Sequence, residues 1–351
     1  MRIHYVAGNW SHDLALVRIH YVDNAARANL SHVNIHSVSH DLPWVRGDMP
    51  DNWAGEGSPL RYPVNVLISY HYFKESNVAE IQGWGLRIIG DSGAYSADSQ
   101  GVVIDVDSFA EWIVRWRANL HWVASLDVIG DQTGSWDNWL ALRSMGLETV
   151  PTIHYGDDPR ALDRYVERGV DFMGLGGMVP YKSEPKRLLR WCLSVMRYAR
   201  DNHPHLRFHG WGVTQPDLVM SLPWWSVDSS GFSASYRYGR ASLFDPRTGK
   251  KIRVQLDGRE VAKHARLLRD VYGVDWRDVA VSTSETRPAV VRMSFRSAQL
   301  LEDYLSRRHR VTPPASLGEP EQGPTISLPL GFPDAQPAKT LWELAAEGNT
   351  P

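Results

Sequence analysis

The feature that most constrains this chain is a regular alternation of short apolar runs with longer amphipathic segments, beginning near residue 64. The short runs have the length of strands, and the longer ones have helical periodicity with capping residues at their ends. The predicted strands are Val64–Ser69, Leu86–Gly90, Trp122–Leu126, Thr149–Ile153, Asp171–Leu175, Arg207–His209 and Trp225–Val227. The predicted helices between them cover residues 75–84, 107–120, 135–146, 158–169, 184–202 and 215–223. This order favours parallel strands joined by helical crossovers.

At least seven such units fit a (β/α)₈ TIM barrel of the α/β class, and a doubly wound sheet is the alternative. We assign residues 61–310 to the barrel and residues 1–60 to an N-terminal extension with a candidate strand over 1–8. The run Asp-Pro-Arg-Thr-Gly at 245–249 predicts the turn of an inserted β-hairpin, with helices over 259–273 and 296–310 after it. The Pro-rich tail, residues 311–351, is expected to be disordered or wrapped over the surface, with a short helix at 339–348.

Bulk composition narrows the class of protein. No stretch approaches the roughly 18 apolar residues of a membrane span, and the first residues lack the apolar core of a signal peptide. The single cysteine, Cys192, excludes an internal disulfide, so a reducing cytoplasm is the expected location. The net charge is −2, but residues 231–310 hold 17 Lys and Arg against 9 Asp and Glu. Such asymmetry fits a polyanion-binding face, and it fits a solvated basic surface equally well.

A polar or glycine-rich run follows every predicted strand. In order these runs are SYHY, DSGAYS, DVIGD, HYGDD, GGMVP, HGWGVT and DSSGF. In a barrel all of these ends share one face, where catalytic groups gather. Asp91 and Asp228 directly follow apolar runs, so we expect them to face each other across the barrel mouth. Two such carboxylates suit chemistry at a sugar carbon, one attacking it and the other moving a proton; the alternative is that either one caps a helix.

Other strand ends carry further candidates. Asp127 could accept hydrogen bonds from the N–H edge of a guanine-type base, or it could be a loop acid. His154 could orient a ligand or be a satisfied core histidine, and Gly174, Gly176 and Gly177 could let a flat ligand approach the backbone. The fourteen histidines form no HxxxH or HExxH pair on a predicted helix, so we predict no metal site.

These motifs resemble those of a known family. DSGAYS resembles the DSGG(F/Y)Q motif of the tRNA-guanine transglycosylases, and GVTQPDLVMSLPWWSVDSS resembles the segment that leads to their nucleophile. LDVIGD, VPTIHYG and GLGGM fall where that family has its base-recognition acid, a glutamine-bearing strand end and a glycine-rich contact. The resemblance covers about Val64 to Val254. SYHY, His154 and VDSSGF make the chain most similar to the 7-deazaguanine DNA transglycosylases of phages and bacterial DNA-modification clusters.

The resemblance implies a role for each matching residue. Asp228 matches the nucleophile that attacks C1′ and forms a covalent intermediate, and Asp91 matches the general acid and base. Tyr95 matches the ring that stacks on the base, and Asp127 matches the acid that reads its pyrimidine edge. His154 stands where a base-contacting glutamine is expected. The backbone-contact loop corresponds to Gly176, Gly177 and Met178, and the further pocket candidates are Ser92, Gly93 and His209.

The expected reaction is exchange of guanine in DNA for a free 7-deazaguanine such as preQ0, without a cofactor. The tRNA enzymes have a CxCxxC…H zinc site that Cys192 alone cannot build, which favours DNA over tRNA. The candidate strip for the DNA backbone is Arg237, Arg240, Arg247, Lys250, Lys251 and Arg253. The alternatives are the same reaction on tRNA, a barrel N-glycosylase or glycoside hydrolase, and a DNA-binding protein on a decayed barrel. A phage-encoded enzyme would act in the host cytoplasm.

Overall fold

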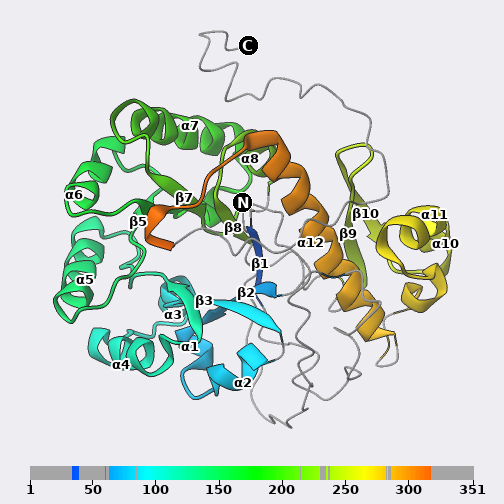
Figure 1. Cartoon of the computed structure of the whole chain (residues 1–351), viewed down its shortest axis with the longest axis horizontal. Coiled ribbons are helices and arrows are strands. Elements are labelled where there is room, and N and C mark those ends of the chain that lie inside the picture. Colours follow the sequence, from blue (N-terminus) through cyan, green and yellow to red (C-terminus); the bar gives the residue numbers. More distant parts are fainter. Residues whose placement is uncertain are drawn as a thin grey trace.

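An eight-stranded parallel sheet forms the centre of the molecule, and helices surround the strands (Figure 1). The computed structural model describes residues 34–38, 60, 63–83, 85–213, 215–229, 235, 238–281, 283 and 286–317. The strands are β1 Asn34–Val38, β2 Val64–Ser69, β3 Leu86–Asp91, β4 Leu120–Val123, β5 Thr152–His154, β6 Phe172–Gly176, β7 Arg207–Gly210 and β8 Ser226–Ser229. Their order, β4-β3-β2-β1-β8-β7-β6-β5, keeps strands that follow one another in the chain adjacent in space. The predicted α/β class with alternating strand–helix units is confirmed.

Backbone hydrogen bonds also connect the two ends of this strand order. Directly after β4, Ala124 forms a parallel bridge with Val150, just before β5. The Ser125 N–H donates to the Val150 carbonyl at 2.9 Å, and the Val150 N–H donates to the Val123 carbonyl at 2.8 Å. The segments around β4 and β5 therefore lie side by side.

The helices that follow the strands cover the sheet. They are α1 Tyr70–Phe73, α2 Val78–Gly83, α3 Ala94–Ser99, α4 Val106–Trp116, α5 Gln132–Ser144, α6 Asp163–Val166, α7 Pro185–Asn202 and α8 Pro216–Ser221, with 3₁₀ turns η2 Pro159–Leu162 and η3 Val179–Tyr181. In α7, Leu188, Cys192, Val195 and Ala199 are buried at helical spacing, and Pro185 occupies the first turn. All six side chains of β2 are buried, as expected for a parallel strand covered on both faces.

The sheet contains one strand that the sequence did not predict. β1 lies within residues 1–60, which we assigned to an extension, and it pairs in parallel with both β2 and β8. The strand predicted over residues 1–8 lies outside the described residues. Among the predicted strands, Val64–Ser69 is confirmed at both ends. The Trp122–Leu126 prediction begins two residues and ends three residues later than β4, and the Thr149–Ile153 prediction begins three residues and ends one residue earlier than β5.

The predicted hairpin is confirmed. Strands β9 Arg240–Asp245 and β10 Lys250–Gln255 pair antiparallel around the predicted turn. Helix α12 (Arg287–His309) runs beside β9, and α10 (Gly258–Ala262) and α11 (Ala265–Leu267) lie on the other side of the hairpin (Figure 1). The single helix predicted over 259–273 is wrong, because α10, α11 and a π-helical turn at Leu268–Tyr272 divide it.

Only the first residues of the predicted tail are described. The Ser316 N–H donates to Asp171 Oδ2 at 3.0 Å, and Arg207 Nη2 donates to Thr312 Oγ1 at 2.8 Å. Residues 311–317, which include the 3₁₀ turn η7 (Ala315–Leu317), therefore lie over the amino ends of β6 and β7. The helix predicted at 339–348 falls outside the described residues. Within the described part of the chain, no helix is both long enough and apolar enough to cross a membrane.

Candidate active site

The carboxyl ends of four strands bring most of the candidate side chains to one edge of the sheet. Asp91 is the last residue of β3, His154 is the last of β5, His209 lies on β7 and Asp228 lies on β8. All these strands are parallel, so their carboxyl ends share an edge. This is the shared face that the strand-end pattern predicted.

Among the described residues, Asp228 is the most deeply buried carboxylic acid. Its exposed fraction is 1%, and its Oδ1 accepts a hydrogen bond from the Gly212 N–H at 2.5 Å. Burial raises the pKa of Asp228 well above its ordinary value, and the negative charge of Asp91 adds to that rise. The Gly212 N–H opposes the rise, because it stabilises the ionised form. A buried carboxyl held by one main-chain donor has the chemistry of a nucleophile or a proton carrier.

Asp91 has a near-neutral pKa. Burial raises the pKa of Asp91 to about 7, and the charge of Asp127 contributes to the rise. The Gly93 N–H donates to Asp91 Oδ2 at 3.1 Å. Gly93 has a φ of +77°, and a Cβ there would overlap the Ser69 hydroxyl, so the turn that supplies this donor requires glycine. An acid with a pKa near neutrality can both take and give a proton.

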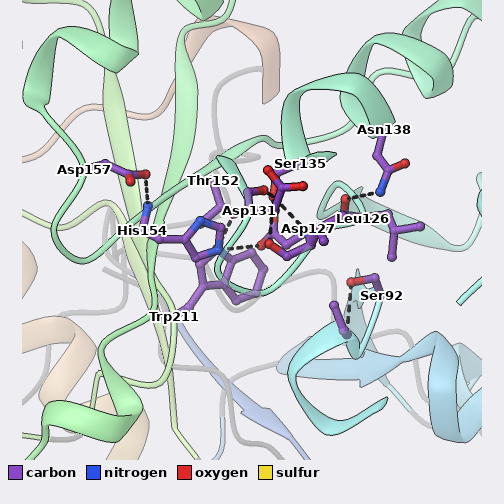
Figure 2. Close-up of polar contacts among 12 residues, drawn as sticks. Ser92, Leu126, Asp127, Asp131, Ser135, Asn138, Thr152, His154, Asp157 and Trp211 are labelled. Carbon is purple, nitrogen blue, oxygen red and sulfur yellow. Dashed lines mark hydrogen bonds and ion pairs between the residues drawn. The ribbon is translucent and has the colours of Figure 1, made fainter. Parts of the chain in front are cut away.

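Asp127 and His154 form a shielded ion pair. His154 Nε2 lies 3.4 Å from Asp127 Oδ2, and the two side chains are 19% and 18% exposed (Figure 2). Burial lowers the pKa of His154, but the charge and hydrogen bond of Asp127 outweigh it, so the pKa stands above its ordinary value. The His154 N–H donates to Asp157 Oδ2 at 2.8 Å. The pair links the loop after β4 to the end of β5. The charge of Asp127 raises the pKa of Asp91, and the charge of Asp91 raises the pKa of Asp228, so the three carboxyl groups affect one another.

The glycines of β6 make room for a tryptophan. A Cβ at Gly174 would overlap Trp211 Nε1, and a Cβ at Gly176 would lie 2.9 Å from Thr152 Cγ2. Trp211 Nε1 donates to Thr152 Oγ1 at 3.0 Å, which fixes the indole beside His154 (Figure 2). Gly177 has a φ of +69°. Trp211 and Thr152 therefore fill the space beside Gly174 and Gly176.

The remaining pocket candidates differ in exposure. Tyr95 lies on α3 with 51% of its surface exposed, so its ring is accessible at the site edge. Ser92 is buried and its Oγ accepts from the Ala94 N–H at 3.3 Å, a local turn contact. The Met178 side chain is buried, with its sulfur 3.6 Å from Cys192 Sγ, so only its backbone can meet a ligand.

The basic candidates of the hairpin divide between its two faces. Because neighbouring residues alternate across a strand, Arg240, Lys251 and Arg253 share one face and Lys250 points to the other. All four are exposed. Arg247 is held by Asp245 through an Nε–Oδ1 contact of 3.0 Å. The sixth candidate, Arg237, lies outside the described residues.

Sequence reasoning missed four residues of this site: Thr152, Trp211, Gly212 and Ser226. Trp211 and Gly212 lie in the run HGWGVT after β7, which was recognised as a polar strand end. No spacing rule shows that the Gly212 N–H meets Asp228 or that the indole fills the space beside Gly174. Those contacts depend on how neighbouring strands are staggered.

No metal cluster is found among the residues that the structure describes: nowhere do three His, Cys, Asp or Glu side chains group in a way that could hold an ion.

The candidate site is built from three carboxyl groups, two histidines and an indole, which belong to Asp91, Asp127, Asp228, His154, His209 and Trp211. Neither a protein-family model nor a curated protein matches this chain.

Proposed function

We propose that the eight strands close into a (β/α)₈ barrel with this site at its mouth. The support is the strand order, which follows the chain on both sides of the β1–β8 pair, together with the bridge between Ala124 and Val150. Helices around the strands fit the same architecture (Figure 1). In such barrels the active site lies at the carboxyl ends of the strands, where Asp91 and Asp228 are found.

The reaction we propose is base exchange at a nucleotide in DNA, in the manner of the 7-deazaguanine DNA transglycosylases. The observation that supports it is the pairing of a buried carboxyl, Asp228, with a coupled acid of near-neutral pKa, Asp91. Attack at an anomeric carbon needs the first kind of group, and proton transfer to and from a base needs the second.

The exchange has two displacements. Attack requires the ionised form of Asp228, which the Gly212 N–H stabilises against the effect of burial. That carboxylate bonds to C1′ as the bond from C1′ to guanine N9 breaks, and Asp91 gives its proton to the departing guanine. A free 7-deazaguanine then loses its N9 proton to Asp91, and its N9 attacks C1′ as the bond to Asp228 breaks. Each displacement inverts C1′, so the product keeps the β configuration. Asp91 ends as it began, protonated, and a pKa of about 7 suits both of its tasks.

The base would be recognised by residues at the carboxyl ends of β4 and β5. Asp127 would accept from the N–H edge of a guanine-type base, while His154 holds that carboxylate and contacts the same base. The accessible ring of Tyr95 would stack on it. A target guanine must leave the DNA stack to reach these groups, so the proposal implies base flipping.

The basic residues of the β9–β10 hairpin favour a polyanionic binding partner. The hairpin follows β8 along the chain, and Arg240, Lys251 and Arg253 share one of its faces and are exposed there. Phosphate contacts of this kind position a protein on nucleic acid without reading its sequence. DNA is preferred to tRNA because the single Cys192 cannot supply the zinc-supported segment of the tRNA enzymes.

A covalent trap tests the proposal. End-labelled DNA is incubated with the full chain and no free base, denatured, and analysed for protein-bound label and by peptide mapping. We expect an adduct on Asp228, absent from Asp228→Asn and retained in Asp98→Asn, where an exposed carboxylate of α3 is removed. Abasic sites without an adduct would indicate a hydrolase instead, and an adduct with tRNA alone would indicate the tRNA reaction.

A further inference from the structure

Two groups, one on β7 and one in the loop after it, converge on one oxygen of Asp228. The Gly212 N–H donates to Oδ1 at 2.5 Å, and His209 Nε2 lies 3.5 Å from the same Oδ1. The second separation is longer than a hydrogen bond, so Nε2 faces Oδ1 without bonding to it at this distance. Oδ2 is therefore the oxygen that neither of these groups holds.

His209 is fixed by its surroundings. It is fully buried, and its Nδ1 lies 2.7 Å from Ser226 Oγ, which belongs to the same strand as Asp228. The rings of Trp122 and Trp211 meet the imidazole edge to face, with centroids 5.1 and 4.1 Å away. With the ring held by three side chains, its Nε2 can face only a narrow region that includes Asp228 Oδ1.

The direction of the contact with Ser226 is linked to the nitrogen that bears the ring proton, because a hydroxyl can donate or accept. When Ser226 Oγ–H donates to Nδ1, a neutral ring carries its proton on Nε2 and presents an N–H to Asp228. Toward the ionised Asp228 that the proposed attack requires, the opposite tautomer would present a lone pair, which is repulsive. The second shell of a histidine commonly fixes its tautomer in this way.

We propose that Ser226 and His209 are positioning residues that, with the Gly212 N–H, direct N–H groups at Oδ1 of Asp228 and leave Oδ2 as the oxygen that attacks C1′. This inference rests on the proposed function. Both N–H groups then face the ester carbonyl of the intermediate, where they stabilise the negative charge that returns to the carboxyl group in the second displacement. Donors aimed at an oxygen where charge develops act in the same sense as an oxyanion hole.

The first test reads the tautomer directly and needs no activity. The full chain is labelled with ¹⁵N-histidine, and long-range ¹H–¹⁵N correlations are recorded, with His209 assigned by the loss of its signals in His209→Gln. We expect a neutral ring protonated on Nε2 in the wild type, and a loss of that preference in Ser226→Ala. A ring protonated on Nδ1, or a Ser226→Ala spectrum with the Nε2 preference unchanged, would overturn the inference. The exposed His205 provides the control, since His205→Gln should leave the signals of His209 in place.

The second test compares two amides at position 209. Glutamine places an N–H near the position of Nε2, whereas asparagine reaches only Ser226. In guanine exchange, we expect His209→Gln to stay within about tenfold of the wild-type kcat and His209→Asn to lose on the order of 10²–10³-fold, with KM for the free base unchanged in both. Equal kcat values in two variants with the same melting temperature would contradict the inference. If the wild type performs no exchange, the proposed function fails, and the tautomer measurement still decides the geometry of His209.

Discussion

At the scale of single residues, the ionisation of Asp91 links the site to folding. In the folded chain its pKa is about 7, because burial and the charge of Asp127 disfavour the ionised form. In the unfolded chain it returns to an ordinary value near 4. The folded state therefore binds the proton more tightly. Between these two pKa values, this group makes the free energy of unfolding fall as pH rises.

Asparagine at position 91 does not titrate, so it removes this fall in the free energy of unfolding with rising pH. We predict that Asp91→Asn is stabilised relative to the wild type by an amount that grows with pH, by at most about 1.4 kcal/mol per unit, and levels off above about pH 7. Urea unfolding at pH 5, 6, 7 and 8 measures the difference. Asp98→Asn, on the exposed side of α3, should show no such trend. A pH-independent difference for Asp91→Asn would show that the folded carboxyl has an ordinary pKa.

The two principal acids could be identified from the sequence, but the groups that hold them could not. Asp91 and Asp228 follow apolar runs directly, and a carboxyl at the end of a buried strand is costly unless it has a role. The Gly212 N–H that bonds to Asp228 belongs to the loop of another strand. Its position depends on the register of β7 with β8, which is a property of the folded sheet.

At the scale of elements, the edge of β9 that does not pair with β10 is bonded by side chains instead of a further strand. The buried Tyr272 hydroxyl donates to the Phe244 carbonyl at 2.8 Å and accepts from the Phe244 N–H at 2.8 Å. Ser297 of α12 accepts from the same N–H at 2.9 Å and donates to the Ser242 carbonyl at 2.8 Å. These contacts satisfy backbone groups of β9 that would otherwise be buried without partners.

The Tyr272 hydroxyl is therefore expected to stabilise the fold. We predict that Tyr272→Phe lowers the free energy of unfolding by about 1–3 kcal/mol, because the buried Phe244 carbonyl loses that donor. Denaturant unfolding followed by tryptophan fluorescence measures the loss. Tyr238→Phe is the matched control, since Tyr238 is 68% exposed and its hydroxyl should contribute little. Equal stability of the two variants would show that the Tyr272 contact is energetically neutral.

The two faces of the hairpin should also differ in DNA binding. Arg253 lies on the hairpin face that also presents Arg240 and Lys251, whereas Lys250 lies on the opposite face. We predict that Arg253→Ala weakens DNA binding and reduces the slope of log K against log salt concentration by about 1, with a smaller change for Lys250→Ala. Fluorescence anisotropy over a range of salt concentrations distinguishes them. Equal slopes would contradict the assignment of the Arg253 face as the DNA contact.

Elements with strong periodicity were predictable, and weakly patterned ones were not. The range 184–202 for α7 was nearly correct because its apolar spacing and its proline agree. β1, with the sequence NIHSV, has only two apolar residues in five, so nothing local marks it as a strand. It is a strand because it pairs with β2 and β8, and these partners are distant in the sequence.

At the scale of the whole molecule, β1 determines the distance between the two catalytic candidates. It inserts between β8 and β2, so the strand with Asp228 and the strand with Asp91 are separated by two others. That separation sets the two carboxyl groups apart around the same edge, coupled in charge. A substrate carbon that lies between them could then meet an attacking oxygen on one side and a proton-transferring one on the other.

The most direct test of this account is base exchange followed by nucleoside mass spectrometry. The full chain is incubated with duplex or single-stranded DNA and isotopically labelled guanine or preQ0, in parallel with tRNA, and the digested nucleosides are analysed. The account predicts that label enters DNA with the wild type and with Asp98→Asn, and that none enters with Asp228→Ala. Label in DNA with Asp228→Ala, or its absence from DNA with the wild type, would contradict the central claim that Asp228 exchanges the base through a covalent intermediate.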